Sequence, residues 1–171
     1  MPTKSTRKAS QRRDRPDLPL RAAVQWACRA RGAPSAARLR AFARAAARGA
    51  TEITLRIVGA AEARRLNRDY RRHDYATNVL TFGYGRSAGR GGTRLRGDVV
   101  LCHPVVVREA RARRKSTEAH YAHLVVHAML HLRGYDHRRA PQRHRMERAE
   151  VHALRRLGFA NPYFEDAAQP R

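Results

Sequence analysis

Alternation of apolar and polar side chains marks the strands that this chain is expected to form. Residues 52–58 alternate in this way and predict a strand with one buried face. Residues 78–82 and 97–102 are short apolar runs that predict two further strands. Residues 18–26 predict the first strand, with a weaker signal because alanine is a poor β former. The glycine-rich residues 83–93 predict a flexible hairpin connection.

Helical signals alternate with these strands and dominate the second half of the chain. Ser35 suits an N-cap for a helix in which Leu39 and Phe42 lie three residues apart, and Pro104 suits the first turn of another. The predicted helices cover 35–48, 60–70, 104–113, a segment that begins at 116–118, and 141–157. This order predicts an α+β fold, a small mixed sheet of about four strands packed with about five helices.

The length of 171 residues suits one domain, which we assign to residues 18–164. Residues 1–17 are polar and basic and are predicted to be a disordered extension, and residues 165–171 are a short tail. The chain has no run of 18 apolar residues, and no apolar signal-peptide stretch follows its basic start. We therefore expect a cytoplasmic protein without a membrane partner.

The charge of the chain favours a polyanionic partner. The formal net charge is +23; residues 1–17 hold six basic and two acidic side chains, a net of +4, which leaves +19 on the remainder. Such a field favours nucleic acid. Of the 37 basic residues 34 are arginine, which suits phosphate but also fits a genome of biased base composition. Cys28 and Cys102 form no C-x-x-C pair, so neither a disulfide framework nor a thiolate zinc site is indicated.

Three histidines supply the most informative chemistry in the chain. His127 and His131 are four residues apart, so on a helix both rings lie on one face and can reach one ion. Gly134 can end that helix and reverse the chain, which allows His137 to return as a third ligand. Three histidines leave the fourth position of a tetrahedral zinc ion open for water, as in catalytic sites. We expect one Zn²⁺ per chain.

Another histidine pair and a protease site are the alternatives to this interpretation. His123 lies eight residues from His131, or about 12 Å along a helix, too far for both to bind one ion, so His120 and His123 are interpreted as packing or surface side chains. The same ligand spacing occurs in metzincin proteases, whose glutamate general base directly follows the first histidine. Ala128 occupies that position here, which argues against a protease.

The run from His127 to His137 resembles the H-G-x-L-H-L-x-G-Y-D-H signature of the YbeY family, bacterial endoribonucleases of ribosomal RNA maturation. Three further segments agree with this family in order and spacing: residues 66–82, the strand 97–102, and the closing helix with 146–150 and 157–159. The resemblance covers about residues 18–164. Ala128 replaces the usual glycine, a small change in a helix.

The resemblance implies hydrolysis of single-stranded RNA, notably near the 3′ end of small-subunit (16S) ribosomal RNA, and a part in ribosome quality control. It also implies zinc held by His127, His131 and His137, and contacts with the small ribosomal subunit, ribosomal proteins and assembly GTPases. Arg71 matches the family's functional arginine, and a guanidinium across the cleft suits the charge that develops on phosphorus. Arg72, one residue on, remains an alternative.

Residues beside the candidate site are expected to support it. Asp136 either accepts a hydrogen bond from a ligand histidine or stabilises the turn at Gly134. Thr77 and Asn78 are expected to pin the start of a strand. The leading hypothesis is a zinc endoribonuclease with His127 and Arg71 in the catalytic site. The alternative is a non-catalytic, zinc-stabilised assembly factor that binds the small ribosomal subunit, and a metalloprotease ranks third.

Overall fold

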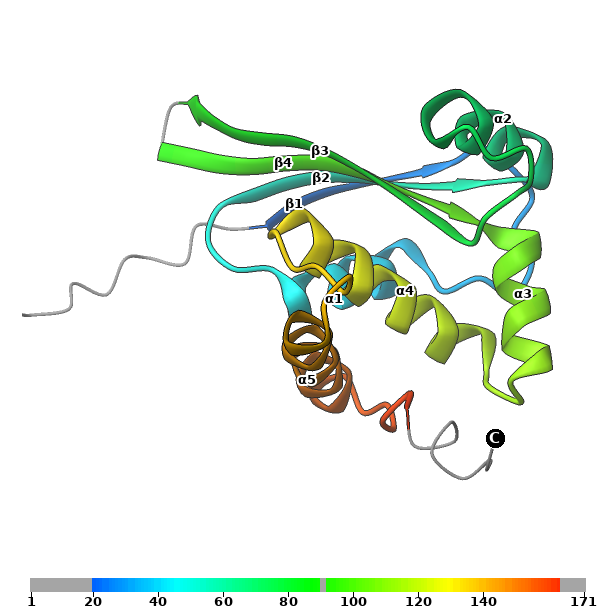
Figure 1. Ribbon diagram of the computed structural model, residues 1–171. Helices are drawn as coiled ribbons and strands as arrows, with labels where there is room; N and C mark the ends of the chain where they lie inside the picture. Colours follow the sequence, from blue (N-terminus) through cyan, green and yellow to red (C-terminus); the bar gives the residue numbers. More distant parts are fainter. Residues whose placement is uncertain (1–19, 90–91, 164–171) are drawn as a thin grey trace, which may run out of the picture.

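A computed structural model describes residues 20–89 and 92–163, which form one sheet and five helices (Figure 1). The strands are β1 (Leu20–Trp26), β2 (Thr51–Val58), β3 (Val79–Gly89) and β4 (Gly92–Cys102). The helices are α1 (Ala36–Ala46), α2 (Ala60–Arg71), α3 (His103–Ala112), α4 (Thr117–Leu132) and α5 (Ala140–Arg156). The predicted α+β class is confirmed.

The sheet is mixed, and its strands run in the order β1-β2-β4-β3. β1 pairs in parallel with β2, and β2 pairs in parallel with β4, with Ile57 opposite Leu101. β3 pairs antiparallel with β4 and forms one edge of the sheet. The alternation predicted for residues 52–58 holds, because Ile53, Leu55 and Ile57 are buried while the residues between them are partly exposed.

The helices divide unequally between the two faces of this sheet. Figure 1 shows α1, α4 and α5 below the sheet and α2 above it. The larger core cluster joins Leu55 of β2 to Phe42 of α1 and to Met129 of α4, all fully buried. A smaller cluster on the other face joins β3 and β4 to Ala63 of α2. Because α4 contacts α1, α3, α5, β3 and β4, it is the element about which the domain is packed.

Gly97 allows the end of α4 to lie close against the sheet. A Cβ atom at Gly97 would stand 2.5 Å from Leu132 Cδ2 and 2.7 Å from the carbonyl oxygen of Phe82. These separations are too short for a methyl group, so the absence of a side chain lets Leu132 pack directly on β4. The last turn of α4, which carries His131, is thereby held at a fixed distance from β3 and β4.

The prediction of a flexible connection over residues 83–93 is wrong. β3 continues to Gly89 and β4 begins at Gly92, so most of this segment is paired strand. The register shifts between Gly83 and Arg86, where Gly85 has φ of 72°, and a bulge of this kind uses glycine without ending the ladder. The antiparallel hairpin itself is as expected.

Some expectations fall outside the part of the chain that the structure describes. These are the extension over 1–17, the tail over 165–171, and the first two residues of the predicted strand 18–26. No helix within residues 20–89 and 92–163 combines the length and apolar character needed to cross a membrane.

Candidate metal centre

Two of the three histidines are presented by α4, whose ends follow from its sequence. The Ser116 hydroxyl caps the helix by accepting a hydrogen bond from the Ala119 amide at 3.1 Å. At the other end Gly134 has φ of 87°, the left-handed conformation that turns the chain away from the helix. On the helix, the Nε2 atoms of His127 and His131 lie 3.0 Å apart.

His137 returns to this pair from the loop after α4. Its ring centroid lies 4.9 Å from that of His131 and 5.8 Å from that of His127. One nitrogen from each of the three rings lies within 4.8 Å of the others, a spacing that could hold one metal ion. The structure therefore brings together the three residues selected from the sequence.

The chemistry of the donor set fits a divalent metal. His127 Nδ1 lies 2.7 Å from Glu150 Oε1 and donates its proton to that carboxylate, which leaves the Nε2 lone pair directed at His131. Two imidazole lone pairs that face each other at 3.0 Å repel unless a cation or proton lies between them. The pKa of His131 is lowered by burial and by His127 and His137, which favours the neutral form that binds metals.

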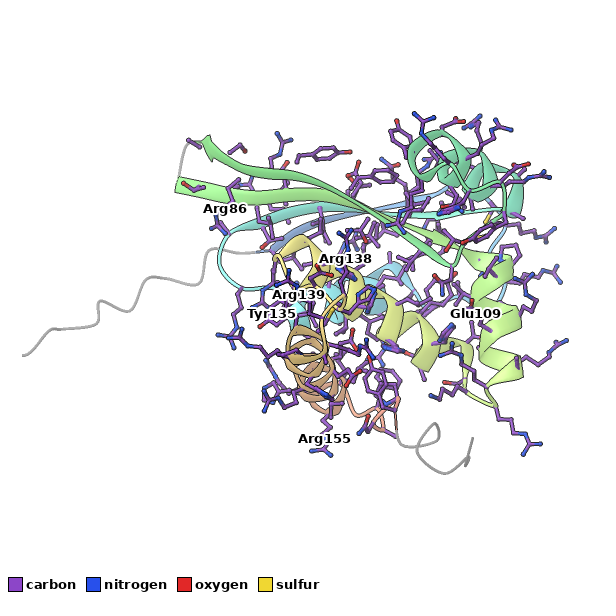
Figure 2. All side chains as sticks on the ribbon, in the orientation of Figure 1. Arg86, Glu109, Tyr135, Arg138, Arg139 and Arg155 are labelled. Carbon is purple, nitrogen blue, oxygen red and sulfur yellow. The ribbon has the colours of Figure 1, made fainter. Side chains whose placement is uncertain are left out.

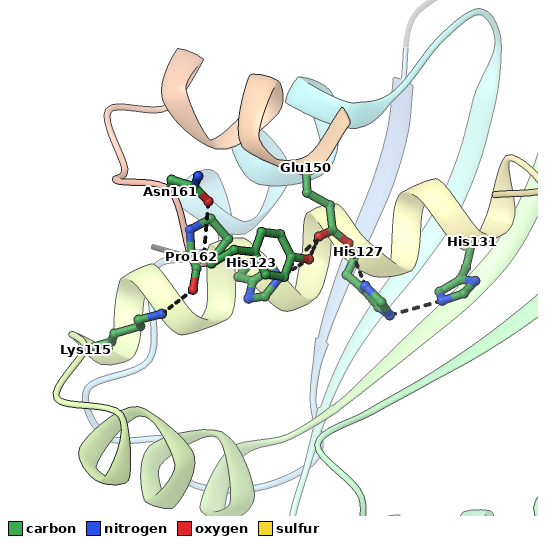
Figure 3. A network of polar contacts seen from close by, with 8 residues as sticks. Lys115, His123, His127, His131, Glu150, Asn161 and Pro162 are labelled. Carbon is green, nitrogen blue, oxygen red and sulfur yellow. Dashed lines mark hydrogen bonds and ion pairs between the residues drawn. The ribbon is translucent and has the colours of Figure 1, made fainter. Parts of the chain in front are cut away.

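Glu150 was not singled out from the sequence, yet it is the main polar support of His127 (Figure 3). Its side chain is 1% exposed. It also accepts a hydrogen bond from the Tyr163 hydroxyl, and its Oε2 lies 3.5 Å from Nε2 of His123. Burial raises its pKa, but the donors His123, His127 and Tyr163 outweigh that effect and lower the pKa to about 2. An acidic residue on the buried face of α5, between Met146 and Leu154, was the available signal.

The histidines open into a cleft of about 860 Å³ between α4, β3 and the end of α2. Its walls include Arg71, Thr77, Asn78, Thr81 and Arg138 together with the three histidines. Arg71 thus lies on the same cleft as the predicted ligands, on the last residue of α2. Arg72 caps α2 in the left-handed conformation, with φ of 60°, and does not line the cleft.

The contacts of Asp136 decide between the two roles considered for it. Asp136 Oδ1 accepts hydrogen bonds from the amides of His137, at 2.7 Å, and Arg138, at 3.1 Å, so it stabilises the turn that carries His137. Among the described residues no histidine ring donates a hydrogen bond to Asp136. Asp136 therefore acts through the backbone of the loop, to which Tyr135 and Arg138, labelled in Figure 2, also belong.

His120 is buried and His123 is partly buried, so both are packing side chains, one of the two alternatives expected for them. His120 is 2% exposed, and its Nε2 lies 2.7 Å from Glu109 Oε2. The same carboxylate accepts a hydrogen bond at 2.9 Å from the side chain of Asn78, whose Oδ1 in turn accepts from the Val79 amide. This network ties the start of β3, one wall of the cleft, to α3 and α4. Asn78 pins the strand as predicted.

Comparison with known proteins found a family model, relatives of similar sequence and a solved structure. The family model described as "Endoribonuclease YbeY" matches residues 35–158. A protein of that name from Aromatoleum aromaticum is 55% identical over 130 residues, which cover 76% of this chain and 81% of the relative. Another from Thiobacillus denitrificans is 51% identical over 144 residues, which cover 84% and 96% of the two chains. A solution structure from Thermotoga maritima aligns with 89% of this chain and 99% of its own, at 19% identity and a TM-score of 0.48.

Proposed function

Because this chain belongs to the YbeY endoribonuclease family, we propose that it is a zinc-dependent endoribonuclease that cleaves single-stranded RNA during ribosomal RNA maturation. The observation that carries the metal dependence is the convergence of His127, His131 and His137 within 4.8 Å at the base of an open cleft. Three neutral imidazoles suit zinc, and a loop-borne third donor leaves a side of the ion accessible to substrate.

Within this proposal each residue of the candidate metal centre has a defined role. A zinc ion held by the three histidines supplies Lewis acidity to the reaction. Glu150 keeps the proton of His127 on Nδ1, and so directs Nε2 at the metal position. Asp136 holds the turn that brings His137 into place. Each of these contacts fixes a ligand before the metal arrives, which lowers the cost of binding it.

Arg71 is proposed to bind the phosphate whose ester bond is cleaved. It lies on the wall of the cleft that contains the histidines, and no carboxylate forms an ion pair with it among the described residues. A planar guanidinium can donate two hydrogen bonds to a phosphate, and these strengthen as negative charge develops. Arg138, which also lines the cleft, provides a second positive charge for the RNA backbone.

The ribosomal context extends the same proposal. The net charge of +23 favours a polyanion, and RNA is the substrate class that the relatives' name specifies. We place the activity in the cytoplasm, on the small ribosomal subunit, in 16S 3′-end processing and ribosome quality control, with ribosomal proteins and assembly GTPases as further contacts.

The test is cleavage of an end-labelled single-stranded RNA by the purified protein with one equivalent of zinc. The informative variant is His137→Ala, and the matched control is His144→Ala, because the His144 side chain is 72% exposed and, in the described part of the chain, its ion pair is with Glu147 at 3.7 Å, away from the candidate ligands. We expect cleavage by the wild type and the control and a loss of activity in His137→Ala. Equal cleavage by all three would contradict the proposal. Small-subunit binding without cleavage by any of them would favour the non-catalytic assembly factor.

A further inference from the structure

A row of basic side chains runs along the outer face of α5. Arg145, Arg148, His152 and Arg155 follow one another at intervals of three, four and three residues, so all four lie on one side of the helix, and all four are exposed. The buried residues of α5, such as Met146 and Leu154, lie on the opposite side. Figure 2 shows Arg155 pointing away from the body of the protein. We call these four residues the α5 row.

The α5 row is connected to the candidate metal centre by hollows in the surface. A hollow of about 420 Å³ is lined by Arg145 and Arg148 and, on its other side, by Gly134, Tyr135 and Asp136. The last three residues also line the cleft that contains the histidines. A third hollow, of about 710 Å³, contains Arg148, His152 and Arg155. The hollow of about 420 Å³ therefore shares three lining residues with the histidine cleft, and it shares Arg148 with the hollow of about 710 Å³. The cleft and the two hollows form one continuous path.

The arginines of this row have no acidic partner in the part of the chain that the structure describes. Among residues 20–89 and 92–163 no carboxylate forms an ion pair with Arg145, Arg148 or Arg155. The nearby carboxylates are engaged elsewhere: Glu147 with His144, and Asp136 with the turn before α5. The guanidinium groups of the row are therefore free to bind an external anion.

We propose that the α5 row binds the phosphates of single-stranded RNA that extends from the cleft past Tyr135, an inference that rests on the proposed function. Arg145 and Arg155 are separated by about 15 Å along the helix axis, so the row serves several successive nucleotides and not a single bound anion. RNA is favoured over an acidic protein because the path is continuous with the cleft, so that one polyanionic strand can occupy both.

The test compares two double variants that change the net charge equally. Arg145→Gln with Arg148→Gln removes two members of the row. Arg108→Gln with Arg111→Gln removes two exposed arginines with the same spacing from α3, which lies apart from α5 in Figure 1. Binding is measured by fluorescence anisotropy in a metal-chelating buffer, with a single-stranded RNA of about 20 nucleotides and an oligonucleotide of about 4.

We expect the α5 double variant to weaken binding of the longer RNA by about 10-fold, and to lower the slope of log K against log salt by about 1.4, for two lost phosphate contacts. Binding of the short oligonucleotide, and of both RNAs by the α3 control, stays at the wild-type value. Equal effects of the two double variants on the longer RNA would overturn the inference. Because this assay needs no cleavage, its outcome is separate from the test of the proposed function.

Discussion

Replacement of Glu150 by glutamine tests how the fold prepares its metal centre. The substitution keeps the shape of the side chain and removes its charge. Glu150 is 1% exposed and touches only one of the three histidines, His127, through a hydrogen bond of 2.7 Å. The variant therefore alters the charge behind one ligand and leaves all three imidazoles in the chain.

The magnitude follows from the pKa of that carboxyl. Its fall from 4.5 to about 2 corresponds to about 3 kcal/mol by which the protein favours the carboxylate over the neutral acid, at about 1.4 kcal/mol per unit. Three groups share this stabilisation, His123, His127 and Tyr163. Together they also offset burial, which acts in the opposite direction. The loss of a carboxylate behind a ligand histidine weakens metal binding by about 10- to 100-fold. We expect a zinc Kd at least about 10-fold above that of the wild type.

The assay is competition for zinc between the protein and a chromophoric chelator. Glu147→Gln is the matched control, because Glu147 lies on the same helix and, among the described residues, its ion pair is with His144 and not with a candidate ligand. The control should bind zinc like the wild type. Circular dichroism shows whether each variant is folded. If folded Glu150→Gln has the same zinc Kd as the wild type, this carboxylate does not support the metal centre.

Three further predictions concern the cleft and its frame. Arg71→Ala should lower kcat for RNA cleavage by about 10²- to 10³-fold with unchanged zinc affinity, whereas Arg72→Asn should keep near-normal kcat, and equal losses would refute the assignment. Gly97→Ala should reduce the free energy of unfolding by about 1–3 kcal/mol in urea titrations. Gly83→Ala should reduce it by less, because the added Cβ would lie 3.6 Å from the same Leu132 side chain. The free energy of unfolding of the metal-free protein should fall as the pH is lowered from 7 to 4. Burial lowers the pKa of His120. Burial raises the pKa of Glu109, but hydrogen bonds from Asn78 and His120 outweigh that effect and lower it. Both groups therefore bind protons more readily in the unfolded chain, and constant stability between pH 7 and 4 would contradict this prediction.

Much of the site could be predicted because its residues are close in sequence. The interval from His127 to His131 requires only a helix, and the return of His137 requires only a glycine turn, so local rules were sufficient. Glu150 could not be assigned in the same way. Its partner lies 23 residues away on another helix, and only the packing of α4 against α5 shows which face of α5 meets His127.

The helix ends could likewise be predicted from neighbouring residues, whereas the strand order could not. The helix starts at Ser35 and Ser116 follow from caps that can be read directly from the chain. The strand order β1-β2-β4-β3 depends on pairing between distant segments, which no local pattern specifies. The glycines of residues 83–93 predict a flexible connection, but Gly85 lies in a bulge that leaves the hydrogen-bonded ladder on both sides intact. The position of Arg71 on the cleft likewise depends on how α2 lies relative to β3.

Anomalous diffraction at the zinc absorption edge, from crystals of the zinc-loaded protein, locates the metal ion directly. We expect one anomalous peak per chain, within bonding distance of a ring nitrogen from each of His127, His131 and His137. A peak bound by other residues, or none at these three rings in protein that cleaves RNA, would contradict this expectation.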